Sequence, residues 1–161
     1  MRNRFVTVAL FLVLSGCLFG SEAGLGGIQL LEGYSAKRSS AVDAAVWKIE
    51  GKSGIRILFE AGPNEGSWAN PEEQNKYSWY REQRISGNEV RFALVKPGLK
   101  TQWEPGDSRG LPPGNILLVT YLLPGNKSDH TANFSAKIAN SGELADVLLM
   151  VVTFDPSKGH F

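Results

Sequence analysis

Residues 44–60, AAVWKIEGKSGIRILFE, carry the clearest signal for the type of fold, and the rest of the chain agrees with it. Trp47 and Ile49 alternate there with charged residues, so an extended segment would have one apolar and one polar face. The link 51–54, GKSG, is bounded by glycines, and IRILFE alternates again after it. Two alternating runs joined by a short glycine-bounded link predict a β-hairpin. We therefore expect a fold built on antiparallel strands.

A second hairpin is expected between residues 78–86 and 89–95. The pair Gly87-Asn88 separates the two runs and is of the kind that two-residue hairpin turns use. In the second run, apolar residues alternate with charged ones, which fits a strand with one buried and one wet face.

Two more strands are expected in the C-terminal half. Residues 116–123, ILLVTYLL, are almost uniformly apolar, and such a run predicts a central strand buried on both faces. Residues 130–138, HTANFSAKI, alternate instead, so that apolar side chains face inward. Asn133, Ser135 and Lys137 are expected to face outward.

Helical signals are few. Asn70, followed by Pro71 and two glutamates, has the order of a capping residue and a first helical turn, which predicts a short turn over 71–75. Asn140 and Glu143 have capping-box spacing, and the residues after them fit both a helix and a buried strand. We expect a helix over 142–149 that runs into a last strand at 151–154.

These signals together predict a mainly β domain with about six to eight antiparallel strands and one or two short helices, either a β-sandwich or an open barrel. Two long loops interrupt the strands, over residues 61–76 and 96–115. The second contains four prolines and four glycines, so no regular ladder is expected to run through it. Long irregular segments inside a compact domain are uncommon and are often functional.

Composition excludes some classes of protein. Hydrophobic residues make up 42% of the 161 residues, which is too many for a disordered chain. The chain has 17 basic and 16 acidic residues, and this near balance argues against a nucleic-acid-binding protein, which would show a clustered basic excess. No nucleic-acid partner is expected.

The N-terminus has the layout of an export signal. Arg2 and Arg4 precede an apolar run over 5–14, which is too short to span a bilayer. The run ends in Leu14-Ser15-Gly16-Cys17, which resembles the lipobox of bacterial lipoproteins. The resemblance covers residues 1–17. It implies cleavage before Cys17 and acylation of that cysteine, and Cys17 is the only cysteine in the chain.

The resemblance divides the chain into a signal peptide over 1–16, a lipidated Cys17 with a flexible tether over 17–29, and a single β-rich domain over 30–161. An alternative places residues 28–31 in a first strand. The implied location is the bacterial cell envelope, with the protein anchored to the membrane by acyl chains such as palmitate. In a diderm organism, Leu18 favours the outer membrane, because an aspartate there is associated with inner-membrane retention in some bacteria.

Catalytic and metal-binding motifs are scarce. His130, with Asp129 and a distant acid such as Asp107 or Asp155, is the obvious suspect for an enzyme or a metal site. No HExxH, CxxC or GxSxG motif occurs, and no glycine-rich loop follows a strand to hold a phosphate. We therefore expect no catalytic residue, no metal and no cofactor.

Aromatic residues are the strongest candidates for a binding site. Trp68 and Trp103 lie in the two long loops, and Tyr77 and Trp79 border the first. Aromatic side chains beside polar ones can stack on a sugar ring or anchor a protein partner. The alternative is that they only fasten the loops to the ends of the sheet.

The sequence therefore predicts a lipid-anchored envelope protein whose β domain binds a glycan or an envelope protein through the two long loops. One alternative is an envelope hydrolase or other enzyme that uses dispersed residues around His130. Another is a structural spacer domain.

Overall fold

The computed structural model describes residues 25–39, 44–63, 66–106, 109–111, 114–123 and 130–159. The expected signal peptide, Cys17 and the first residues of the expected tether lie outside these ranges. The described residues form seven strands, one α-helix and two short 3₁₀ helices. The strands are β1 (Tyr34–Ser39), β2 (Ala45–Gly51), β3 (Arg56–Gly62), β4 (Tyr77–Ile85), β5 (Asn88–Val95), β6 (Ile116–Leu122) and β7 (Thr131–Lys137). The helices are η1 (Pro71–Lys76), α1 (Ser141–Val151) and η2 (Pro156–Lys158).

All seven described strands belong to one antiparallel sheet in the order β1-β2-β3-β7-β6-β5-β4. The prediction of a mainly β, antiparallel fold is confirmed. The two packed sheets of a sandwich do not form among these strands, because β3 pairs with β7 and joins both halves of the chain into one surface. β1 and β4 are the two edges.

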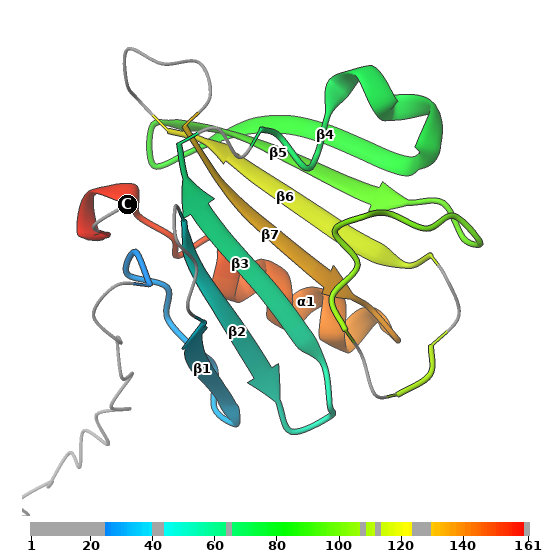
Figure 1. Cartoon of the computed structure of the whole chain (residues 1–161), viewed down its shortest axis with the longest axis horizontal. Helices are drawn as coiled ribbons and strands as arrows, with labels where there is room; N and C mark the ends of the chain where they lie inside the picture. The colour runs from blue at the N-terminus through cyan, green and yellow to red at the C-terminus, as the bar shows by residue number, and fades with distance from the viewer. Residues whose placement is uncertain are drawn as a thin grey trace, which may run out of the picture.

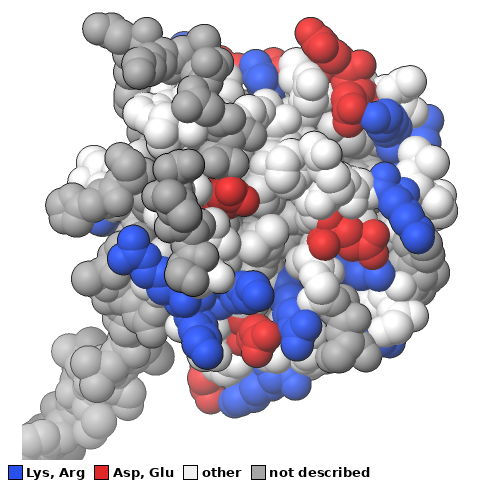
Figure 2. Space-filling model, in the orientation of Figure 1, with Lys and Arg blue, Asp and Glu red and all other residues white. Residues whose placement is uncertain are grey.

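The sheet is covered by α1 on one face and by loops on part of the other (Figure 1). Helix α1 lies behind it in this view, and the 96–106 segment crosses in front of it. Figure 2 shows the loop-covered face in the same orientation. The layers are therefore helix, sheet and loops.

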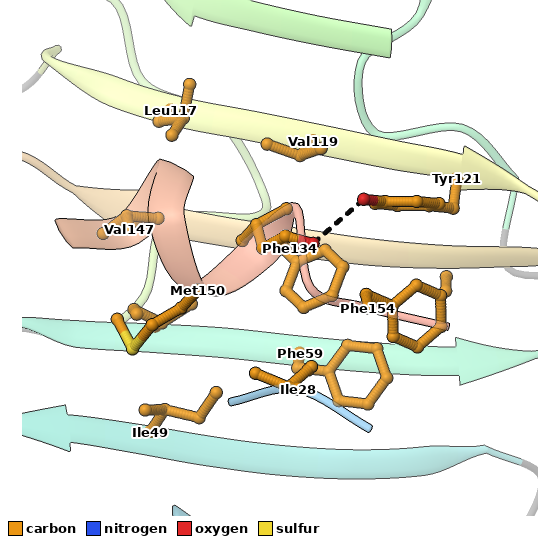
Figure 3. Close-up of a cluster of buried hydrophobic side chains, with 14 of the residues drawn as sticks. Ile28, Ile49, Phe59, Leu117, Val119, Tyr121, Phe134, Val147, Met150 and Phe154 are labelled. Atoms are coloured by element: carbon orange, nitrogen blue, oxygen red, sulfur yellow. Dashed lines mark hydrogen bonds between the residues drawn. The ribbon is translucent and has the colours of Figure 1, made fainter. Parts of the chain in front are cut away.

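The core between the sheet and α1 is aromatic at its centre (Figure 3). Phe59 and Phe134 are directly paired across β3 and β7, and their rings stack at 4.7 Å. Phe154 packs edge-on against both of them and against Tyr121. The Tyr121 hydroxyl donates to the carbonyl oxygen of Val151 over 2.9 Å, which ties β6 to the end of α1.

Both expected hairpins are confirmed. β2 and β3 bury Trp47, Ile49, Ile57 and Phe59 on the helix side. β4 and β5 pair through residues 77–95, and their turn residues are Ser86 and Gly87, one position earlier than expected, both with positive φ. β6 is buried along both faces, as its apolar run predicted.

The ambiguous segment after Asn140 is a helix. The Asn140 side chain accepts the backbone N–H of Glu143 over 3.0 Å, as the capping spacing predicted. The expected strand at 151–154 is wrong, because α1 continues to Val151 and a turn then brings Phe154 into the core. The expected turn over 71–75 is confirmed as η1, with Asn70 as its cap.

The N-terminal boundary of the domain needs correction. Leu25 and Ile28, expected in a flexible tether, are 0% and 1% exposed and belong to the core under the sheet. The Gly26 carbonyl also accepts the Asp155 backbone N–H over 2.7 Å. Residues 28–31 form no strand, and the first strand is β1, which the sequence pattern did not indicate. The folded domain therefore includes residues from Leu25 onward.

Ile28→Ala is expected to lower the free energy of unfolding by about 2–5 kcal/mol, because it leaves a cavity in a packed core. Gln29→Ala is the matched control. Its side chain is exposed, and its backbone N–H bond to the Thr153 hydroxyl remains, so a change within about 0.5 kcal/mol is expected. Denaturant unfolding measures both. Equal stability of the two variants would show that this segment does not pack on the core.

Candidate functional site

A row of polar side chains on the loop-covered face is buried. Thr131, Asn133, Ser135 and Lys137 of β7 alternate with the apolar residues that face α1, and all four are buried, as is Thr120 of β6. The alternation was predicted correctly. The expectation that this face is wet was wrong, because both long loops lie across it.

The first loop is fastened by the side chain of Asn133. Its Oδ1 accepts the Trp68 backbone N–H over 3.2 Å and the Thr120 hydroxyl over 2.7 Å, and its Nδ2 donates to the Gly66 carbonyl over 3.0 Å. The Thr120 hydroxyl oxygen in turn accepts the Ala69 backbone N–H over 3.0 Å. Unpaired buried backbone groups cost about 1–3 kcal/mol each, so these side chains allow the loop to lie on the sheet.

The second loop is fastened farther along the same strand. The Ser135 hydroxyl donates to the Trp103 carbonyl, and the Lys137 ammonium lies 2.7 Å from the Glu104 carboxylate. The Arg109 guanidinium donates to the Lys137 carbonyl over 2.8 Å and also pairs with Glu143 at the start of α1. β7 thus holds one loop with its first half and the other loop with its second half.

The two loops meet through a stacked tryptophan pair. The rings of Trp68 and Trp103 are nearly parallel, at 10°, with centroids 4.5 Å apart. Trp68 is 2% exposed, whereas Trp103 is partly exposed. At the base of the loops, the Lys96 ammonium donates to the Asn75 carbonyl over 2.7 Å. The loops are therefore joined to each other as well as to the sheet.

A cavity of about 360 Å³ lies between the loops over β4, β5 and β6. η1 and the 99–103 segment provide its walls. It is lined by Glu73, Lys76, Tyr77, Val95, Leu99, Lys100, Thr101, Gln102, Trp103 and Leu118. Its walls thus combine an indole and aliphatic side chains with amide, hydroxyl and charged groups.

Of the four predicted aromatic site residues, the structure places two at this cavity. Trp103 lines it and is partly exposed, and Tyr77 lines it from the bottom of the first loop at 6% exposure. Trp68 is not available to a ligand, because it supports Trp103 from behind. Trp79 is 43% exposed, but it packs against Phe92, whose side chain belongs to the core on the α1 side of the sheet.

Tyr77 acts as a structural group at the floor of the cavity. Its hydroxyl accepts the Asn70 backbone N–H over 3.2 Å and lies 3.4 Å from the Trp68 carbonyl, to which it donates. Burial raises the pKa of this phenol, so that it stays protonated at neutral pH. It offers no general base.

Sequence reasoning missed the polar lining of the cavity. Glu73 and Lys76 face each other across one turn of η1, with 2.6 Å between the carboxylate and the ammonium. Thr101 and Gln102 precede Trp103 on the opposite wall. Length and composition identify the two loops from the sequence. The spacing of their polar residues, however, does not indicate which of them line a cavity.

The alternative site around His130 brings together only part of the residues that the sequence suggested for it. His130 and Asp155 do line one open hollow, of about 560 Å³, at another end of the sheet. The Asp155 carboxylate is already engaged there by the backbone N–H and the hydroxyl of Ser157, at 3.0 and 2.6 Å. Asp129 and Asp107 lie outside the described residues. Among those described, no group of three or more potential metal ligands occurs.

Comparisons with known proteins add no assignment. No family model, no curated protein and no solved structure matches this chain at a significant level. Within the described residues, no helix is long and apolar enough to cross a membrane. The function must therefore be inferred from the geometry.

The Arg109–Glu143 pair predicts a pH dependence of stability. Burial raises the pKa of Glu143, but hydrogen bonds from the Ala139 backbone N–H and the Arg109 guanidinium outweigh it and hold the pKa below its ordinary value. A lowered pKa in the folded state means that the carboxylate stabilises the fold above the ordinary pKa. That stabilisation is lost as the pH falls through the lowered pKa.

Glu143→Gln is therefore expected to lower the free energy of unfolding by about 1.5–3 kcal/mol at neutral pH, with a difference that shrinks in acid. Urea unfolding at neutral and acid pH measures it. Glu72→Gln, at an exposed carboxylate, is the control. A Glu143→Gln effect of the same size at both pH values would contradict the assignment.

Proposed function

We propose that this protein is a lipid-anchored component of the bacterial cell envelope and that its β domain is a non-catalytic module that binds a glycan. The ligand site is the cavity between the loops, and the observation that carries the proposal is the partly exposed Trp103 in its wall. Buried Trp68 backs this ring, so that it is held in place before any ligand binds.

The chemistry of the cavity suits a sugar. Its volume lies within the range of small-ligand sites, at the lower end. A sugar ring has an apolar C–H face that can stack on an indole, and hydroxyls that bond to polar groups. Trp103 and Leu99 supply the apolar surface, and Thr101, Gln102 and Lys100 supply donors and acceptors.

Rigid walls favour affinity. Ordering of a loop on binding lowers affinity, by about 0.5–1.5 kcal/mol for each immobilised side chain. Here Asn133 and Ser135 hold the two loops on the sheet in the absence of ligand. A ligand would therefore meet a preformed site.

The lining supports binding rather than hydrolysis. Glycoside hydrolysis uses a pair of carboxylates on either side of the scissile bond. Among the residues that line the cavity, Glu73 is the one acid, and Lys76 already neutralises it.

The lipid anchor is supported by the N-terminal sequence, where Leu14-Ser15-Gly16-Cys17 ends an export-type apolar run. The buried Leu25 leaves seven residues, 18–24, between Cys17 and the domain. A flexible segment of this length spans roughly 15 Å. The domain would on average stand closer to the lipid surface than it would on a tether that ends at residue 29.

A thermal-shift screen of residues 23–161 against glycans and peptidoglycan fragments tests the ligand site. A specific sugar at 100 times its Kd should add about 2.7 kcal/mol to stability, or roughly 5–15 °C in Tm. Trp103→Ala is expected to abolish the shift. Trp79→Ala is the matched control, because that exposed ring lies outside the cavity, and it should keep the shift.

Two results would refute the ligand site. One is a panel without any sugar that raises the Tm. The other is a shift that survives Trp103→Ala or is lost equally in Trp79→Ala.

Radiolabelled palmitate tests the anchor in a bacterial host. The full-length chain is expected to incorporate label and to fractionate with membranes, whereas Cys17→Ser should incorporate none, because the acceptor thiol is absent. Label retained by Cys17→Ser, or no label on the natural chain, would rule out lipidation at this cysteine.

A further inference from the structure

A pair of like charges lies directly across two strands at one end of the sheet. Lys37 of β1 is the register partner of Lys48 of β2, and both side chains are exposed. Arg38 follows on β1 and is exposed too, and it borders the same hollow at the sheet edge, although the strand alternation starts its side chain on the opposite face, across from Trp47. Like charges directly opposite each other in an antiparallel pair destabilise the sheet. An anionic partner outside the sheet would relieve this repulsion.

Within the described residues, no ion pair relieves this repulsion. Of the nearby acids, Glu50 pairs with Arg56 at 3.0 Å and Glu32 lies 4.0 Å from Lys52. Lys37, Arg38 and Lys48 have no such partner in the described part of the chain. We call these three residues the basic patch.

The basic patch borders a hollow of about 460 Å³ that is also lined by the hydroxyl-bearing Ser35 and Ser39 and by Glu50, whose carboxylate pairs with Arg56. Figure 2 shows several Lys and Arg side chains, with acidic side chains between them, over the part of this face where Figure 1 places β1, β2 and β3. Hydroxyl and cationic groups together are the donors that phosphate oxygens accept. The three basic side chains around the hollow are exposed, so they can meet an extended anionic surface.

We propose that the basic patch docks the domain on an anionic lipid surface. This inference rests on the lipid anchor of the proposed function, because the seven residues between Cys17 and Leu25 could reach at most roughly 28 Å and would hold the domain near the bilayer. β1 starts nine residues after Leu25 and is the edge strand that the chain enters first. Exposed basic residues near an anionic leaflet are attracted within a Debye length.

Docking through β1 and β2 would also determine where the ligand cavity lies relative to the docked strands. The cavity lies over β4, β5 and β6, and four strand spacings of about 4.8 Å separate β2 from β5, or roughly 19 Å. The cavity opens on the same face of the sheet as Lys37 and Lys48, so it would lie beside the docked strands rather than under them.

Vesicle co-sedimentation of the full-length chain tests the proposal. The chain is made by cell-free synthesis, which adds no lipid, so the result does not depend on acylation of Cys17. Vesicles of phosphatidylcholine are compared with vesicles that also contain phosphatidylglycerol. The apolar N-terminal segment is common to all variants, and the preference for anionic vesicles isolates the contribution of charge.

Lys37→Glu is expected to lower that preference about tenfold or more, since each basic residue near an anionic surface contributes roughly a factor of five. The same substitution places a glutamate opposite Lys48 and is expected to leave the Tm unchanged or to raise it. Arg81→Glu makes the same change of charge on exposed β4, at the opposite edge of the sheet, and should lower the preference less than threefold.

Three outcomes would overturn the proposal: no preference of the natural chain for anionic vesicles, an undiminished preference in Lys37→Glu, or an equal loss in Arg81→Glu. Binding to heparin without binding to vesicles would assign the basic patch to a soluble polyanion and would also overturn it. Trp103→Ala should leave the vesicle preference intact, so failure of the ligand site is distinguishable from failure of this surface.

Discussion

The side-chain amide of Asn133 is the contact on which the functional face of this domain depends. A loop that lies flat on a sheet turns backbone groups toward a buried surface, and each must find a partner. Asn133 serves the backbone of Gly66 and Trp68, and it positions the Thr120 hydroxyl that accepts the Ala69 N–H. Without these polar groups on the central strands, the first loop would remain in solvent.

The ligand cavity follows from this attachment. Once the first loop is held, Trp68 is buried, and its ring becomes the support on which Trp103 of the second loop stacks. The Ser135 hydroxyl then fixes the second loop at the Trp103 carbonyl. On the opposite face of the sheet, α1 contributes Val147, Met150 and Val151 to an apolar core around Phe134 and Phe154. Strand β7 therefore contributes apolar side chains to the core on one face and polar side chains that hold the loops on the other.

Local pattern was enough to predict much of the sheet. The alternation around Trp47, the apolar run of β6 and the cap at Asn140 are each decided by neighbours within a few residues, and each prediction is confirmed. Burial of Trp68 is different, because the residue that holds its backbone lies 65 positions away. The same holds for Leu25 and Ile28, whose glycine-rich surroundings are typical of a tether but whose side chains fill the core beneath the sheet. The burial of these residues depends on contacts between segments that are distant in the sequence. A local hydrophobic pattern contains no signal for such contacts.

Native-state hydrogen exchange at the backbone amides of Trp68 and Ala69 measures how firmly the first loop is held on the sheet. If Asn133 and Thr120 hold the first loop as part of the folded body, these two amides exchange about as slowly as those of the central strands β6 and β7. We expect this slow exchange at both amides. Exchange of both amides orders of magnitude faster than the central strands, as in a loop that opens on its own, would contradict it.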